Sequence, residues 1–192
     1  MVLILGKPLH MRVIWLKYLF FALGIVKGMT SRMKVKFKGN EVTLQGNHVE
    51  VGESAPDFNV VNKDLETVKA SSFQGKRIYV SVPSIDTPVC DMEIRRFNEE
   101  ATKYKDAKVY VISMDLPFAQ QRWCGSAGVE NVEVLSDYKY RNFGQNFGTY
   151  IEELGLLTRA IFVVDANDEV IYVEYCEEVG EQPNYEAALA AL

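Results

Sequence analysis

Histidine and cysteine are both scarce in this 192-residue chain, and their scarcity limits its chemistry. The only histidines are His10 and His48, so a histidine-based metal site is nearly excluded, and neither is well placed as the base of a cysteine hydrolase. The three cysteines, Cys90, Cys124 and Cys176, are too few for a disulfide-rich secreted scaffold, and no two form a Cys-x-x-Cys motif. We expect neither a metal nor another cofactor.

Acidic residues are missing from the first 40 positions, which carry eight Lys and Arg, whereas the rest of the chain has 13 basic against 26 acidic residues. An acidic body repels phosphate backbones, so we expect no nucleic-acid partner. The chain has 48% hydrophobic and 24% charged residues, which is typical of a globular protein.

A hydrophobic run long enough to span a membrane is also missing. Residues 13–26 are mostly apolar, but Lys17 interrupts them and the longest uncharged run covers residues 18–26, whereas a span requires about 20 residues. A secretion signal or anchor is one interpretation of this stretch, and an ordered extension is another. We favour the interpretation that residues 1–32 precede the working protein and that residues 33–192 form its single domain.

Turn residues and hydrophobic periodicity predict an α/β order for this domain, which contains no internal repeat or linker. Near its start we expect a β-hairpin, with residues 42–44 and 48–51 flanking Gly46-Asn47. The other predicted strands cover residues 58–61, 67–68, 77–82, 108–114, 132–135, 160–164 and 169–175. The predicted helices cover residues 90–104, 118–124, 140–147 and 185–192. This order fits a thioredoxin-like α/β sandwich around a mixed sheet.

The stretch most informative about chemistry joins a predicted buried strand to a helix that starts with Cys90. A thiol in a first turn meets unpaired N–H groups and the positive end of the helix dipole, which favour the thiolate. The helix end alone does not stabilise a thiolate sufficiently at neutral pH, so we expect a cation nearby. Thr87 is placed for its hydroxyl to reach the sulfur. The alternative is a capped helix start with an incidental buried cysteine.

Five segments carry a family resemblance. Residues 82–91 read Val-Pro-Ser-Ile-Asp-Thr-Pro-Val-Cys-Asp, and Cys124 follows in Phe-Ala-Gln-Gln-Arg-Trp-Cys, 34 residues after Cys90. Arg159 lies in Leu-Leu-Thr-Arg-Ala-Ile-Phe-Val-Val-Asp. Together with the segments at 42–46 and 183–189, these strings resemble the bacterial thiol peroxidase branch of the peroxiredoxins, and the resemblance covers the whole predicted domain.

The resemblance implies a peroxiredoxin fold, and it implies roles for four residues. Cys90 would be the nucleophile that attacks the peroxide, Thr87 would orient the peroxide, and Arg159 would be the expected cation. Cys124 would convert the resulting sulfenic acid into a Cys90–Cys124 disulfide. Because two cysteines can be joined only when their backbones approach within about 7 Å, we expect local unwinding of one or both segments during turnover.

The same resemblance implies hydrogen peroxide and organic hydroperoxides as substrates, thioredoxin as the reductant, and a homodimer. With no membrane span expected, the predicted location is cytoplasmic. One alternative is a thiol-based redox sensor or disulfide exchanger of the same fold, and another is a binding domain that has kept only the fold.

Four further side chains near these motifs receive secondary interpretations. Cys176 lies outside the matching segments and is interpreted as a passive thiol, with an additional resolving cysteine as the alternative. We expect Asp86 and Asp91 to face solvent, since a carboxylate turned inward would oppose formation of the thiolate. Trp123 is interpreted as helix packing rather than as a docking residue.

Overall fold

The computed structural model describes residues 33–192. The predicted extension, residues 1–32, lies outside the described residues, so its interpretation stays a prediction. Within the described part, no helix is both long enough and apolar enough to cross a membrane.

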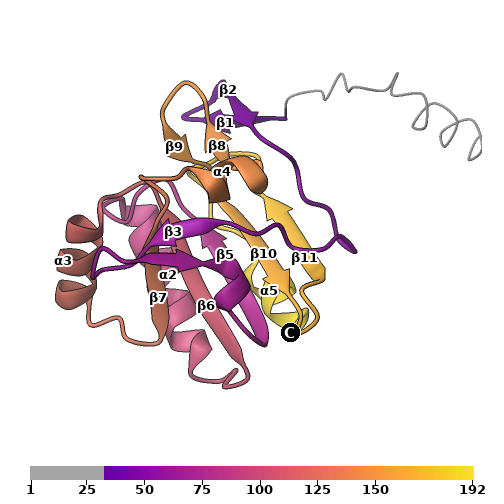
Figure 1. Cartoon of the computed structure of the whole chain (residues 1–192). Coiled ribbons are helices and arrows are strands. Elements are labelled where there is room, and N and C mark those ends of the chain that lie inside the picture. Colours follow the sequence, from indigo (N-terminus) through magenta and orange to yellow (C-terminus); the bar gives the residue numbers. More distant parts are fainter. Residues whose placement is uncertain (1–32) are drawn as a thin grey trace, which may run out of the picture. The chain divides into compact units, whose positions relative to one another are not determined.

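A seven-stranded mixed sheet forms the centre of the domain (Figure 1). Its strands follow the order β11-β10-β5-β6-β7-β3-β4. They are β3 (Asn59–Val61), β4 (Thr67–Lys69), β5 (Lys76–Ser81), β6 (Ala107–Ser113), β7 (Val132–Ser136), β10 (Ala160–Val164) and β11 (Val170–Tyr175). Strands β5, β6 and β7 are parallel, whereas β10 is antiparallel to both β5 and β11. The predicted thioredoxin-like α/β fold is confirmed.

Four α-helices accompany the sheet in the described part of the chain. They are α2 (Pro88–Ala101), α3 (Pro117–Ala127), α4 (Asn142–Asn146) and α5 (Tyr185–Ala190). Helix α2 connects β5 to β6, and α3 connects β6 to β7, so each is the crossover between two parallel strands. Both helices therefore begin at the carboxyl ends of their strands, which is the edge where open α/β sheets bind ligands.

Side chains that alternate along the buried strands divide the core into two apolar layers. Ile78 and Val80 of β5 pack in one layer with Phe97 of α2. Tyr79, between them, packs in the other layer with Phe143 of α4. All five side chains are at most 1% exposed. A strand that is buried on both faces reads as a continuous apolar run, as β5 does.

Most predicted elements are confirmed with boundaries shifted by one or two residues, which is the usual uncertainty of helix and strand ends. Two helix ends differ more. Helix α2 ends at Ala101 rather than at Tyr104, and α3 continues through Gly125 to Ala127. The signal that ends α3 is Gly128, which has a φ of 66° and donates its N–H to the carbonyl oxygen of Cys124 (3.1 Å).

The predicted hairpin around Gly46-Asn47 is wrong. Strand β2 (Asn40–Gln45) pairs instead with β1 (Lys34–Phe37), and the turn between them contains Lys38 and Gly39, both with positive φ. Two consecutive positive φ values are typical of two-residue hairpin turns. The domain therefore begins with a β-hairpin, as expected, but this hairpin lies one strand earlier than the sequence predicted.

Gly46 directs the chain across α4 instead of reversing it. Its backbone, with a φ of 107°, packs directly against Gln145, and the Asn47 N–H donates to the Gln145 carbonyl oxygen (2.9 Å). Strands β1 and β2 belong to a second, four-stranded sheet, in which β2 pairs with β8 (Tyr150–Ile151) and β8 pairs with β9 (Leu156–Leu157). These two strands were not predicted, because a two-residue strand has no detectable periodicity.

Gly39 and Gly46 form a matched pair that tests this packing. A Cβ at Gly39 would meet no heavy atom within 4 Å, whereas a Cβ at Gly46 would lie 2.0 Å from the Gln145 carbonyl oxygen. We expect Gly39→Ala to lower the free energy of unfolding by about 1 kcal/mol because of its left-handed backbone, and Gly46→Ala by about 3 kcal/mol because steric strain is added. Urea unfolding measures both values, and equal losses would contradict the close approach.

Candidate active site

The first turn of α2 carries Cys90 and is capped by Thr87. The Oγ1 atom of Thr87 accepts the backbone N–H of Cys90 (3.4 Å), and the Thr87 hydroxyl donates to the carbonyl oxygen of Ser84 (3.1 Å). Pro88 stands at the start of the helix, where its missing N–H is not needed. The Thr87 hydroxyl thus contacts two backbone groups, and its role toward a peroxide stays a prediction.

The carboxylate of Asp115 ties the loop before α2 to the end of β6. The Ser84 hydroxyl donates to Oδ1 (2.8 Å), while the Ile85 N–H (2.9 Å) and the Ser113 hydroxyl (2.7 Å) donate to Oδ2. Ile85 and Ser113 are fully buried. Hydrogen bonds to a carboxylate are stronger than neutral ones, so this group holds the loop in one conformation beside the sheet edge.

A guanidinium group lies beside the buried sulfur of Cys90. Cys90 is 0% exposed, and Nη2 of Arg159 is 3.3 Å from Sγ. Arg159 directly precedes β10, and because β10 pairs with β5, the sheet brings this residue to the start of α2. Its Nε donates to the carbonyl oxygen of Val179 (3.0 Å), and its Nη1 donates to Oε2 of Glu93. The guanidinium is held on three sides, at the position where the sequence analysis expected a cation.

Glu93 also belongs to this site, although it was not predicted from the sequence. The residue lies one turn after Cys90 on α2, is fully buried and forms an ion pair with Arg159. Its second oxygen, Oε1, is buried without a hydrogen-bond partner among residues 33–192. The available signal was its spacing, since residues three apart on a helix are neighbours. A carboxylate on the buried face needs a cationic partner, and Arg159 is that partner.

One guanidinium therefore contacts two groups that are negative when ionised, the Glu93 carboxylate and the Cys90 sulfur. Water is excluded from the site, so its electrostatic interactions are stronger than they would be at the surface. The guanidinium of Arg159 and the N-terminus of α2 thus place a positive charge and the positive end of a helix dipole next to the Cys90 sulfur. The same guanidinium can stabilise charge on an oxygen that the sulfur attacks.

Cys124 lies in the last turn of α3 and is half-buried. Its side chain packs at the edge of the apolar layer that contains Cys90, and it also lines a surface cavity of about 830 Å³ beside Lys63 and Val134. Burial raises the pKa of the Cys124 thiol. Cys90, Cys124 and Cys176 are all free thiols in this structure.

Cys176 has the properties of a passive thiol. It follows β11, and its backbone N–H donates to the carbonyl oxygen of Arg159 (3.0 Å). The side chain is 6% exposed, and burial raises the pKa of the thiol to about 12. Very little thiolate forms at neutral pH with such a pKa, and the thiolate is the reactive form.

The predictions for the neighbouring polar and aromatic side chains had mixed outcomes. Asp86 is exposed, as expected, but Asp91 is turned toward α3, where it accepts the Nε1–H of Trp123 (3.1 Å). The prediction that Asp91 faces solvent is met only in part, because its side chain is 32% exposed while its carboxylate also binds the indole N–H and Arg95. Trp123 is 8% exposed and packs between helices, as expected. Within the described residues, no cluster of His, Cys, Asp or Glu could hold a metal ion.

The chain is similar to known thiol peroxidases over most of its length. Residues 50–189 match the family described as Redoxin. The thiol peroxidase of Clostridium acetobutylicum is 55% identical over 159 residues, which cover 83% of this chain and 97% of the relative. The thiol peroxidase of Bacillus subtilis is 52% identical over 159 residues, with 82% and 95% covered. A solved structure of a peroxiredoxin-like protein from Aquifex aeolicus has a TM-score of 0.77 at 40% identity, with 82% and 95% covered.

A thioredoxin-like sheet that carries a buried cysteine in the first turn of a helix, with an arginine at its sulfur, defines the class of the peroxiredoxins. The chain belongs to the Redoxin family and, within that family, to the peroxide-reducing thiol peroxidases. The resemblance noted in the sequence is confirmed.

Substitutions of Glu93 test whether the buried ion pair holds Arg159 in place. We expect Glu93→Ala to lower the free energy of unfolding by about 3–5 kcal/mol, because the guanidinium then loses its buried carboxylate partner. Glu93→Gln keeps an oxygen acceptor for Arg159 and should lower the free energy of unfolding much less. Urea unfolding measures stability, and stopped-flow oxidation by hydrogen peroxide measures reactivity, which should fall more in the alanine variant. Two variants as stable and as reactive as the wild type would refute this role of Glu93.

Proposed function

We propose that the enzyme reduces hydrogen peroxide and organic hydroperoxides through a Cys90 sulfenic acid and a Cys90–Cys124 disulfide. The observation that best supports this cycle is the 3.3 Å contact between Nη2 of Arg159 and the buried sulfur of Cys90. A cysteine that only filled space in the core would not require a guanidinium that is itself 1% exposed.

The first step is attack of the Cys90 thiolate on the terminal oxygen of the peroxide. A sulfur–oxygen bond forms while the oxygen–oxygen bond breaks, and the leaving oxygen takes a proton and departs as water or alcohol. Negative charge moves from sulfur to the leaving oxygen, so a cation that contacts both stabilises the transition state. We assign this function to Arg159, and the orientation of the peroxide to Thr87.

The second step joins Cys90 and Cys124. The Cys124 thiol condenses with the sulfenic acid, a disulfide forms and water leaves. An external dithiol of the thioredoxin type then reduces the disulfide by thiol exchange, which returns both cysteines to the reduced state. Because this reductant belongs to a reducing compartment, we propose that the enzyme acts in the cytoplasm.

Substitutions of the three cysteines test this cycle in a steady-state assay with peroxide and thioredoxin. We expect Cys90→Ser to abolish peroxide consumption, because no other described cysteine contacts a cation. Cys124→Ser should consume one equivalent of peroxide and then stop, because the sulfenic acid cannot be converted into a disulfide. Cys176→Ser is the matched control and should keep the wild-type rate.

A redox sensor or disulfide exchanger with the same cysteines predicts a different result. Such a protein forms the disulfide but shows negligible steady-state consumption of peroxide, even when Cys90 is intact and thioredoxin is supplied. A binding domain predicts no Cys90–Cys124 link in the mass spectrum after one equivalent of peroxide. Either outcome in the wild-type protein would overturn the proposed function.

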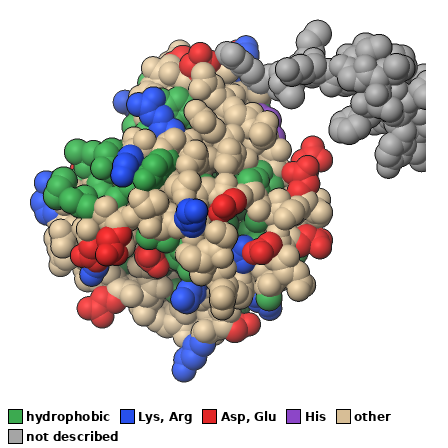
Figure 2. Space-filling model, in the orientation of Figure 1, with side chains coloured by type: hydrophobic (Ala, Val, Ile, Leu, Met, Phe, Trp, Pro, Cys, Tyr) green, Lys and Arg blue, Asp and Glu red, His purple; other side chains and the backbone are tan. Residues whose placement is uncertain are grey.

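We also propose that two copies of the chain pair through the start of α3. Leu116 and Phe118 are 51% and 64% exposed there, and Asp115 beside them binds the loop before Cys90. Figure 2 shows hydrophobic side chains gathered on the side of the molecule where α3 lies. Burial of large apolar side chains drives association, and the family resemblance implies a homodimer.

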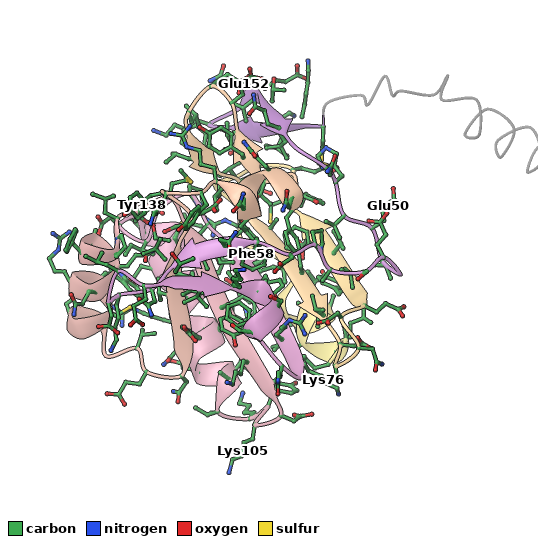
Figure 3. All side chains as sticks on the ribbon, in the orientation of Figure 1. Glu50, Phe58, Lys76, Lys105, Tyr138 and Glu152 are labelled. Carbon is green, nitrogen blue, oxygen red and sulfur yellow. The ribbon has the colours of Figure 1, made fainter. Side chains whose placement is uncertain are left out.

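Phe118→Asp tests the proposed dimer. A carboxylate in a buried apolar contact is strongly unfavourable, so we expect this variant to sediment as a monomer while the wild type sediments as a dimer. Val51→Asp is a matched control, because Val51 is 62% exposed and adjoins Glu50, which Figure 3 labels on the side away from α3. Sedimentation of both variants like the wild type would place the contact elsewhere.

A further inference from the structure

Helix α3, which carries Cys124, has few of the features that stabilise a helix by itself. Its N-cap residue, Leu116, makes no side-chain cap hydrogen bond, and only three of its 11 residues are buried. Gly125 lies inside the helix, where glycine is less favourable than alanine by about 1 kcal/mol. The helix therefore depends on contacts with the rest of the domain.

Two of these contacts come from neighbouring turns of α2. The Asp91 carboxylate accepts the Nε1–H of Trp123 (3.1 Å) and the Nε–H of Arg95 (2.9 Å). Arg95 in turn donates from Nη1 to the carbonyl oxygen of Ala127 (2.9 Å), and its guanidinium carbon lies 5.8 Å from the centre of the Trp123 ring. These bonds reach the last two turns of α3.

A third contact lies one turn further along α2. The Oδ1 atom of Asn98 accepts the backbone N–H groups of Glu130 (3.1 Å) and Asn131 (2.8 Å), just after α3. Asp91, Arg95 and Asn98 are spaced four and three residues apart, so they lie on one face of α2. We call these three contacts the α2–α3 ladder.

The first contact of the ladder joins the residues next to the two cysteines. Asp91 directly follows Cys90, and its partner Trp123 directly precedes Cys124. The Cys90 sulfur contacts Arg159, whereas Cys124 lines the cavity beside Lys63. The two sulfurs thus face different polar groups, and we expect one or both of their segments to unwind when the disulfide forms. Unwinding of the last turns of α3 would break the bond between Trp123 and Asp91, because this bond joins that part of α3 to α2.

We propose that Asp91, Arg95 and Asn98 are positioning residues that hold α3 closed, and that the strength of the ladder sets the rate at which Cys124 resolves the Cys90 sulfenic acid. This inference rests on the proposed function. While the ladder is closed, a second peroxide can oxidise the sulfenic acid to a sulfinic acid and leave as water or alcohol. A weaker ladder favours the disulfide, and a stronger one favours overoxidation.

Adjacent arginines on α2 supply the test and its control. Arg95 belongs to the ladder, whereas Arg96 contacts α5, with its guanidinium carbon 4.0 Å from the centre of the Tyr185 ring and Nη2 3.5 Å from Glu186. The two side chains are equally exposed, at 45% and 46%. Arg95→Gln and Arg96→Gln therefore remove the same charge from the same helix, but only the first weakens the hold on α3.

Both substitutions are made in the full chain that also carries Trp15→Phe, so that Trp123 is its single tryptophan. The chain with Trp15→Phe alone is the reference protein. After rapid mixing with hydrogen peroxide, fluorescence follows Trp123, and quenched samples analysed by mass spectrometry give the sulfenic, disulfide and sulfinic forms. We expect Arg95→Gln to form the disulfide about threefold to tenfold faster, the effect of losing a few weak bonds, and to give proportionally less sulfinic acid. The initial oxidation of Cys90 should keep its rate, and Arg96→Gln should match the reference protein in both steps.

Asn98→Ala removes the third contact independently and should also accelerate disulfide formation without changing the initial oxidation. Equal resolving rates in the Arg95, Arg96 and Asn98 variants would overturn the ladder while leaving the peroxidase cycle intact. Absence of any Cys90–Cys124 disulfide in the reference protein would instead overturn the proposed resolving function of Cys124, and the ladder with it.

Discussion

The buried guanidinium of Arg159 is the interaction on which the site depends. It joins three elements that are distant in the chain, because Glu93 lies on α2, Val179 follows β11 and Arg159 itself precedes β10. A guanidinium removed from water is strongly unfavourable unless its donors are satisfied, so these partners are needed for stability as well as for chemistry. The Cys90 sulfur completes the set, which means that the same cation that stabilises the fold at this point is positioned to stabilise a thiolate.

Two demands conflict around this centre. The pocket of Cys90 is closed, with the Asp115 carboxylate holding its loop and Thr87 capping its helix. Closure excludes water and strengthens the electrostatic interactions that favour attack on a peroxide. The proposed disulfide with Cys124 would demand the opposite, namely movement of a neighbouring segment. The contacts around the two cysteines differ in burial. The ion pair of Arg159 and Glu93 beside Cys90 is buried, whereas the ion pair of Arg95 and Asp91 beside α3 is partly exposed.

Much of the fold and of the site could be predicted from local sequence. The buried strand β5, the capped start of α2 and the hairpin of β10 and β11 have periodicities and turn residues that act over a few positions. Thr87, Cys90, Cys124 and Arg159 stand in segments that resemble a family. The hairpin at Gly46 was misplaced because the conformation of that glycine is determined by Gln145, which lies about 100 positions later. Glu93 was overlooked because a carboxylate on an apolar helix face is meaningful only once its cation is known.

The sequence by itself determined the order of the strands of the central sheet and of the helices between them, the helix start that places Cys90 at a positive dipole, and the membership of the chain among thiol peroxidases. These properties follow from short stretches of chain, in which the neighbours along the backbone are the neighbours in space. Only the tertiary structure decided that Glu93 shares the charge of Arg159 and which side chains of α2 contact the helix of Cys124. Such contacts join residues that are far apart in the chain, and their energies depend on burial and distance, which no local pattern contains.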